Sequence, residues 1–311
     1  FGSRRSSVIV GMSGHSLHSK TGSAGLVEAV NWNYYRYAAD YLHFGGMLFG
    51  VGVIYHTKSV QGFSWKTQIL FQLVYLTRYL DVFTTVQAFY LLFFKVTFNI
   101  ITAVMLYFFW QLQNTYDAVA DSCNIVAILA PLVVVTYLMS GGSGLEEELW
   151  TFSEYLEPFA LIPQYIMCHR AAVLRPEALG YVLAVGGYRV LYVCNWLYKR
   201  SKLHSAYHDY TSWTGGLLEC IFFTDFVIRI FRRGAGASRS TFIGSVLVKV
   251  DDKAGQLSEK IEMSVMGRRL PYGLSGHAEK DEDDLKPWCA ADQFTDEEGS
   301  KLLTLSGDID L

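Results

Sequence analysis

The chain has 311 residues, of which 51% are hydrophobic, 15% aromatic and only 18% charged, and its formal net charge is −3. This apolar, slightly acidic composition lacks the excess of basic residues that is typical of nucleic-acid-binding proteins. The five cysteines are scattered, with no CxxC pair, so neither a disulfide framework nor a zinc site is expected. The composition therefore indicates an integral membrane protein without a metal or other cofactor.

Hydrophobic segments recur along the middle of the chain, each of about 17 to 23 residues, the length that crosses a hydrocarbon core of about 30 Å. They cover residues 36–55, 67–86, 88–110, 124–141, 149–168, 179–198 and 210–230. The pattern predicts an all-α membrane protein with seven transmembrane helices in the lipid bilayer. Several segments carry internal charges, so a plain hydropathy scan should score the first, second and sixth weakly.

Polar ends flank this apolar part, which divides the chain into three predicted regions. Residues 1–30 are rich in Ser and Gly and are expected to be disordered, and residues 31–233 form the seven-helix domain. Residues 234–311 carry acidic runs such as 279–284 and are expected to be a mostly disordered tail, with no specific role required. Lys and Arg near the short loops favour a cytosolic C-terminus, which puts the N-terminus on the luminal side.

Charged residues inside the apolar segments are the strongest functional signal. Arg78 and Asp81 lie one helical turn apart in a run that is otherwise apolar. A charge in a membrane-spanning helix costs about 3 kcal/mol or more, so it persists only where it is paired or functional.

Other polar side chains recur at helical spacing, which places them on single helix faces. The first segment carries Arg36, Asp40 and His43; the fifth carries Trp150, Glu154 and Glu157; the sixth carries Tyr188, Tyr192, Asn195 and Lys199, with Arg189 beside them. Cations exceed acids on these faces, which predicts a polar cavity for an anionic ligand. Internal ion pairing that fixes helix register, with no ligand, remains the alternative.

Patterns of catalytic residues are missing, since neither GxSxG nor HExxH occurs. The chain is therefore not expected to be an enzyme. His43 is better suited to sensing pH, because an ordinary histidine pKa of about 6.5 lies between the pH values of neutral and acidic compartments. A histidine that is merely hydrogen-bonded is the alternative.

Five motifs resemble the KDEL receptors, also called ER lumen protein-retaining receptors, in order and with matching loop lengths from about Asn31 to Phe231. They are FSWKTQ at 63–68, TRYLDVF at 77–83, LWTFSEYLE at 149–157, LIPQ at 161–164 and YRVLYVCNW at 188–196. The resemblance implies a SWEET-like fold of two three-helix bundles joined by the fourth helix, with Pro163-Gln164 as its PQ signature.

The resemblance also implies the ligand, which is the C-terminal Lys/His-Asp-Glu-Leu signal of escaped ER residents. Arg78 is expected to bind the terminal carboxylate, Arg36 and Lys199 the acidic side chains, and Asp81, Glu147 and Trp150 the basic first residue. Tyr192, Asn195 and Trp196 are expected to complete the site, and Asp40 and Arg189 to form structural ion pairs.

By the same resemblance, His43 becomes protonated in the acidic Golgi, rearranges Tyr188 against Glu157 and closes the helices on the peptide, which is released in the ER. Proton and peptide then tighten each other's binding. Asp225 matches an acid linked to retrograde traffic, and the COPI coat and Arf-regulatory machinery are the expected partners in the ER and Golgi membranes.

Two departures stand out: Lys199 occupies a position where the family usually has Arg, and a long acidic tail replaces the short Lys-rich tail. The alternative function is a proton-coupled transporter of a small solute on the same fold.

Overall fold

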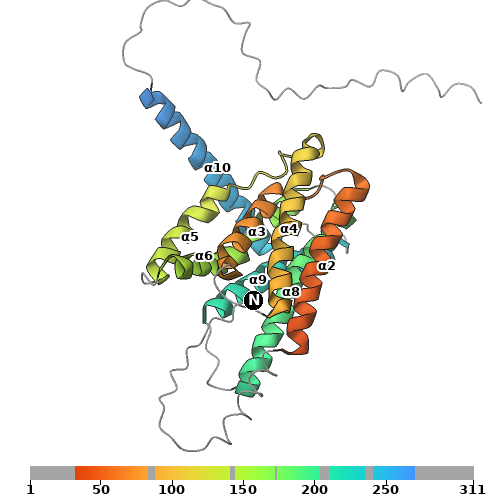
Figure 1. The fold of residues 1–311 in the computed structure, drawn as a ribbon. Helices are drawn as coiled ribbons and strands as arrows, with labels where there is room; N and C mark the ends of the chain where they lie inside the picture. Colours follow the sequence, from red (N-terminus) through yellow and green to blue (C-terminus); the bar gives the residue numbers. More distant parts are fainter. Residues whose placement is uncertain are drawn as a thin grey trace, which may run out of the picture. The chain divides into compact units, whose positions relative to one another are not determined.

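The computed structural model describes residues 32–82, 88–140, 144–171, 174–203, 210–234 and 241–269, and every regular element in these ranges is helical (Figure 1). Residues 1–30 and the part of the expected tail beyond residue 269 lie outside the described residues. The long helices are α2 (Tyr34–Thr57), α3 (Trp65–Arg78), α4 (Phe89–Gln111), α5 (Ile125–Ser140), α6 (Leu145–Ala160), α7 (Ile162–Arg170), α8 (Pro176–Leu203), α9 (Tyr210–Gly234) and α10 (Phe242–Arg269). Two short 3-10 helices, η1 (Leu80–Val82) and η2 (Gln113–Thr115), follow α3 and α4. Each of the seven predicted segments therefore contains helix.

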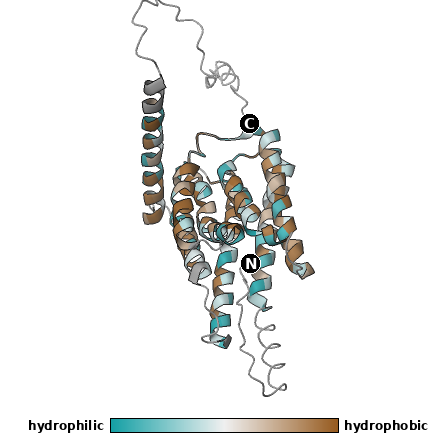
Figure 2. Ribbon diagram, turned by 60° about the vertical axis from the view of Figure 1, so that its left-hand side comes forward, coloured by the Kyte–Doolittle hydropathy of each residue, from teal (hydrophilic) through white to brown (hydrophobic). Residues whose placement is uncertain are grey.

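Among the described residues, α4 alone is both long enough and apolar enough to cross a membrane by length and composition. A shorter apolar helix covers Ile125–Met139. Apolar and polar residues mix along the other helices, as the colouring in Figure 2 shows. Buried charges account for part of that mixture in α2, α3, α6 and α8.

Helix contacts follow a repeated pattern. In the set α2, α3 and α4, both α2 and α3 contact α4. In the set α6, α8 and α9, both α6 and α8 contact α9. Two further interfaces join the sets, because α2 packs along α8 and α3 packs along α6. Each of these pairs the first helix of one set with the second helix of the other. Helix α5 packs on α6.

The contact of α2 with α8 depends on two glycines one turn apart. A Cβ atom on Gly46 would lie 2.6 Å from the Ala184 side chain, and one on Gly50 would lie 2.8 Å from the Tyr181 ring. Small residues at this spacing let helices approach closely in membranes, where backbone proximity increases van der Waals contact.

The fifth predicted segment, 149–168, consists of two helices rather than one. Helix α6 ends at Ala160 and α7 begins at Ile162, with Pro163 in its first turn, where a missing backbone N–H costs nothing. Gln164 follows, and its side chain accepts a hydrogen bond from Ser64 N (2.8 Å) and donates one to the Gly62 carbonyl (2.9 Å). The break thus ties α7 to the start of α3.

This tie extends into a group that we call the Gln164 network: Gln164, Ser64, Thr67, Asp121 and Tyr116. Gln164 N donates to Thr67 Oγ1 (3.0 Å), and Ser64 Oγ donates to Asp121 Oδ1 (2.8 Å). Asp121 Oδ2 accepts from Tyr116 Oη at 2.7 Å. Hydroxyls, amides and one carboxylate therefore satisfy each other without a cationic side chain.

Helix α10 lies within the segment that the sequence analysis expected to be mostly disordered. Its first turn is capped by Asp225 of α9, whose carboxylate accepts hydrogen bonds from Thr241 Oγ1 (2.6 Å), Gly244 N (3.1 Å) and Ile243 N (3.3 Å). A carboxylate at a helix N-terminus satisfies free N–H groups and interacts favourably with the helix dipole. The expectation was based on the acidic composition of the whole tail and overlooked the apolar residues at helical spacing in 243–261.

Candidate functional site

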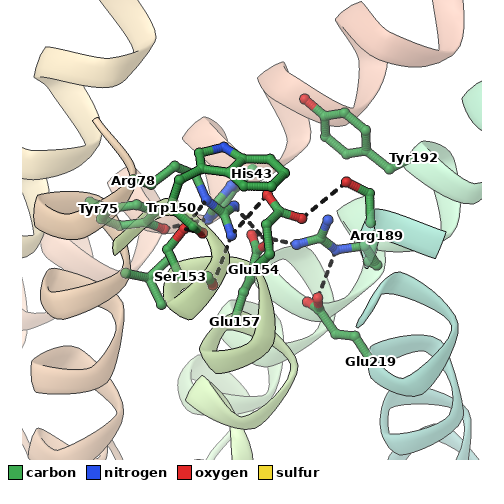
Figure 3. A network of polar contacts seen from close by, with 12 residues as sticks. His43, Tyr75, Arg78, Trp150, Ser153, Glu154, Glu157, Arg189, Tyr192 and Glu219 are labelled. Carbon is green, nitrogen blue, oxygen red and sulfur yellow. Dashed lines mark hydrogen bonds and ion pairs between the residues drawn. The ribbon is translucent and has the colours of Figure 1, made fainter. Parts of the chain in front are cut away.

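Buried charges meet where α3, α6, α8 and α9 converge beside α2 (Figure 3). Arg78, the last residue of α3, places Nη1 2.7 Å from Glu157 Oε2 and Nη2 3.3 Å from Glu154 Oε1. Its Nε donates to Ser153 Oγ (3.1 Å) and its Nη2 donates to the Ser153 carbonyl (2.9 Å). One face of α6 therefore binds the whole guanidinium fork.

Arg189 of α8 extends this group to α9. Its Nη2 forms an ion pair with Glu157 Oε1, and its Nε lies 2.7 Å from Glu219 Oε2. Glu219 is only 1% exposed, and its Oε1 has no hydrogen-bond partner among the described residues. We call Arg78, Glu154, Glu157, Arg189 and Glu219 the Arg78 cluster.

His43 of α2 lies beside the cluster and contacts it through an aromatic ring. Its imidazole stacks on Tyr188, with ring centroids 4.0 Å apart, and the Tyr188 hydroxyl donates to Glu157 Oε1 at 2.7 Å. Its Nε2 is 3.0 Å from the Tyr75 hydroxyl, and Phe98 stacks on it at 4.5 Å. A change in the charge of His43 therefore acts on Glu157 across one tyrosine.

The charges of the Arg78 cluster do not balance. Two guanidiniums face three carboxylates, so the cluster has one excess negative charge when all five groups are ionised and His43 is neutral. A buried net charge is costly. One proton, taken up by His43 or by Glu219, would restore neutrality.

Asp40 lies on α2 one turn before His43 and is fully buried. Its Oδ2 accepts a hydrogen bond from Tyr90 Oη at 2.8 Å, and its Oδ1 accepts one from Tyr192 Oη. The recorded hydrogen bonds of this acid thus come from two tyrosines, on α4 and α8. Tyr192, which was expected to bind the ligand, lies directly against Asp40.

Two residues predicted to bind the ligand, Arg36 and Asn195, lie close to the start of α2. The Arg36 guanidinium is 4.6 Å from the centre of the Trp32 ring, and Asn195 Oδ1 accepts from Asn33 Nδ2 at 2.6 Å. Both side chains are buried. The N-cap of α2 and the second half of α8 are therefore joined at this end of the bundle.

Asp81 differs from the expectation that it shares a continuous helix with Arg78. Helix α3 ends at Arg78, and Asp81 lies in the separate helix η1. Asp81 Oδ2 lies 2.6 Å from Lys95 Nζ of α4. Breaking the helix separates the two charges, so Arg78 pairs with α6 and Asp81 with α4. The sequence reading missed Lys95, although the same rule for charges in apolar segments applies to it.

Four further predicted residues lie around these groups. Trp196 is buried and its ring centre is 6.2 Å from that of Tyr192, and Lys199 is buried one turn further along α8. Glu147 and Trp150 are half-buried in the first turns of α6. Figure 3 shows Trp150 beside Arg78. Asp225 lies apart from all of them, at the cap of α10.

The sequence reading also missed Ser153, Tyr75 and Glu219. Ser153 follows Trp150 by three residues and was hidden among the motif residues, whereas Tyr75 was one of many aromatic residues. Glu219 is an acid in the apolar seventh segment, so the rule that a charge in such a segment is paired or functional also applies to it. Among the described residues, no group of three His, Cys, Asp or Glu side chains could hold a metal ion.

Comparison with known proteins gives a consistent result. The family model described as "ER lumen protein retaining receptor" matches residues 59–199. The chain is 34% identical to the ER lumen protein-retaining receptor of Drosophila melanogaster over 195 residues, covering 62% of this chain and 91% of the relative. It is 33% identical to ER lumen protein-retaining receptor 3 of Mus musculus (62% and 90%) and 34% identical to the Dictyostelium discoideum receptor (62% and 91%).

Proposed function

Because the chain belongs to the ER lumen protein-retaining receptor family, we propose that it binds the C-terminal Lys/His-Asp-Glu-Leu signal of escaped ER residents in the acidic Golgi. The members of this family are receptors, so the chain is a transmembrane receptor in ER and Golgi protein transport. No catalytic reaction is assigned to it. In this proposal the receptor returns its cargo to the ER and releases it at near-neutral pH.

The proposal includes seven membrane crossings in a SWEET-like arrangement. The sets α2, α3, α4 and α6, α8, α9 would be the two bundles, with α5 between them and α7 continuing α6. The repeated contact pattern of the two sets supports this arrangement. The N-terminus would be luminal and the C-terminus cytosolic, as the Lys and Arg distribution favours.

The chemistry of the site fits a peptide with three negative charges and one positive charge. In the proposed complex, the terminal carboxylate replaces the acids of α6 on Arg78, because a guanidinium fork binds carboxylates in bidentate fashion. Arg36 and Lys199 bind the two acidic side chains. The basic first residue replaces Lys95 on Asp81, with Glu147 and Trp150 beside it, while the polar and aromatic side chains Tyr192, Asn195 and Trp196 line the peptide.

One observation carries the pH dependence: the His43 ring lies flat against Tyr188, whose hydroxyl is bonded to Glu157. A proton on His43 draws Glu157 away from its competing guanidiniums. Arg78 is then released for the peptide carboxylate. Proton and peptide thus favour the same state, and by linkage peptide binding is strongest at acidic pH and weakens as the proton leaves.

A peptide titration of the full-length receptor tests this function. Purified protein is titrated with a His-Asp-Glu-Leu peptide at about pH 5.5 and about pH 7.2, on the two sides of an ordinary histidine pKa. We expect binding at least about fivefold tighter at the acidic pH, the lower end of typical coupling energies. The same peptide with an amidated C-terminus is the matched control, and it should bind weakly at both. Equal binding at both pH values, or no binding at either, would overturn the proposal.

Coat recruitment belongs to the proposal as well, with COPI and Arf-regulatory proteins as the cytosolic partners. Asp225 was the residue expected to signal transport. In this chain it caps α10, so partner access to Asp225 would depend on that helix.

A further inference from the structure

Helix α10 lies beyond the residues matched by the family model and is attached to the bundle along one face. Asp251 accepts hydrogen bonds from Asn124 N (2.8 Å) and Ser122 Oγ (3.2 Å), and it forms an ion pair with Arg170 at 3.1 Å. One turn earlier, Leu247 packs on the apolar cluster around Ile166. The first half of α10 is therefore held in a defined rotation.

That rotation leaves a second apolar face exposed. The side chains of this face are 42–82% accessible, and they occupy about 100° of the helix circumference. They are Phe242, Val246, Val250, Leu257 and Ile261. No described part of the chain covers them, although an apolar face of this length on a helix normally packs on something.

Charges are segregated around the same helix. Lys249, Lys253 and Lys260 lie along one edge of the exposed apolar face, within about 20° of Phe242. All three are exposed, and none forms an ion pair with a described acid. The acids of α10 lie on the opposite half, where Asp251 and Asp252 pair with Arg170. The uncovered face is therefore apolar and cationic, without acids.

The attachment point sets the level of this face. Asp225, which caps α10, lies about two and a half turns before α9 ends at Gly234. Gly244 of α10 is packed against His169, near the end of α7. Helix α10 thus starts beside α9 and before the end of that helix, which is its cytosolic end in the proposed topology.

We propose that the exposed face of α10, formed by Phe242, Val246, Val250, Leu257, Ile261 and the three lysines, binds the anionic lipid surface around the bundle. Interfacial helices have this design, with apolar residues that enter the acyl boundary and lysines that meet lipid phosphates and carboxylates. The first half of α10 is anchored by protein contacts, and lipid holds the second half.

Hydrogen exchange of the full-length receptor tests this inference. The receptor is placed in nanodiscs of neutral phosphatidylcholine or of phosphatidylcholine with phosphatidylserine, and amide exchange of residues 249–262 is followed by mass spectrometry. One lysine near an anionic surface is worth about fivefold in binding, so we expect exchange at least about tenfold slower in the anionic discs. The triple variant Lys249→Gln, Lys253→Gln, Lys260→Gln should lose this difference.

A control variant changes the opposite half of the helix, Glu259→Gln with Glu262→Gln, and should keep the lipid dependence. Exchange that is independent of lipid charge, or unaffected by the lysine variant, overturns the inference. So does protection that follows the number of receptors per disc, which would identify a second copy as the occupant. Peptide binding measured in the same discs separates this result from a failure of the proposed receptor function.

Discussion

The Gln164 network and the Arg78 cluster are both buried polar groups between helices, yet they are built on different principles. In the Gln164 network each amide and hydroxyl has a partner, and the Asp121 carboxylate accepts from Ser64 and Tyr116. In the Arg78 cluster, carboxylates compete for two guanidiniums, and Glu219 Oε1 has no hydrogen-bond partner in the part of the chain that the structure describes.

This difference indicates that the Gln164 network stabilises the fold, whereas the Arg78 cluster can change its arrangement. A network in which every polar group has a partner has one favoured arrangement, because any rearrangement leaves a buried donor or acceptor without a partner. A cluster with competing acids and an excess charge has several arrangements of similar energy, and a proton or an anionic ligand selects among them. We therefore expect changes in the first region to affect folding and changes in the second to affect binding.

The largest expected effect is at Arg78. Arg78→Ala should weaken peptide binding by about 30-fold to several thousand-fold, because truncating one partner of a buried charge pair costs about 2–5 kcal/mol. It also leaves Glu154 and Glu157 short of a cation, so the protein should lose stability. Binding at acidic pH and thermal unfolding measure the two effects.

Arg78→Lys is the matched variant, since it keeps the charge and loses the fork. It should retain more stability than Arg78→Ala and still bind the peptide poorly. If Arg78→Lys binds as tightly as the unchanged receptor, the bidentate contact with the peptide carboxylate does not exist.

The second effect concerns His43. His43→Ala should remove the pH dependence of binding, a loss of about 5- to 150-fold in the affinity ratio between acidic and neutral pH. The sign follows from linkage: the bound state takes up the proton, so the unchanged receptor loses affinity as pH rises. Binding isotherms over a pH series measure this.

His43→Gln provides the control, because its amide can replace the imidazole as a partner of Tyr75 while remaining neutral. It should be as insensitive to pH as His43→Ala and more stable. A pH response that survives in both variants would assign the switch to another group, with Glu219 the first to be examined.

A change in the Gln164 network should act in the opposite way. Gln164→Leu leaves Ser64 N and the Gly62 carbonyl without their partners, which costs about 1–3 kcal/mol for a buried polar group. Thermal unfolding should shift to lower temperature, while the pH dependence of peptide binding in the folded fraction stays unchanged. A shifted pH dependence would show that the two regions are coupled.

The smallest effect is expected at Lys199. Lys199→Arg should tighten peptide binding up to about tenfold, because a guanidinium makes two charge-assisted hydrogen bonds to a carboxylate where an ammonium makes one. Competition binding with peptides that are substituted at the Asp or at the Glu position measures which acidic side chain accounts for the tighter binding. Weaker binding by the arginine variant would mean that Lys199 is adapted to a different signal.

The helical class, the segments that contain helices and the family could all be predicted from the sequence. Apolar stretches of membrane length and charges at helical spacing are local properties, and the five motifs are specific strings. Arg36, Asp40, His43, Glu157 and Lys199 could be selected in this way because a charge in an apolar segment is conspicuous without knowledge of its partner.

The pairing of the charges, in contrast, depends on how the helices pack and could not be predicted from the sequence. Arg78 and Asp81 are neighbours in sequence, but the end of α3 directs one to Glu157 and the other to Lys95. The arrangement of Glu219 on Arg189 and of Asp225 on α10 likewise depends on helix packing. The physical reason is that spacing fixes the face on which a side chain lies, whereas helix contacts and helix ends fix what that face meets.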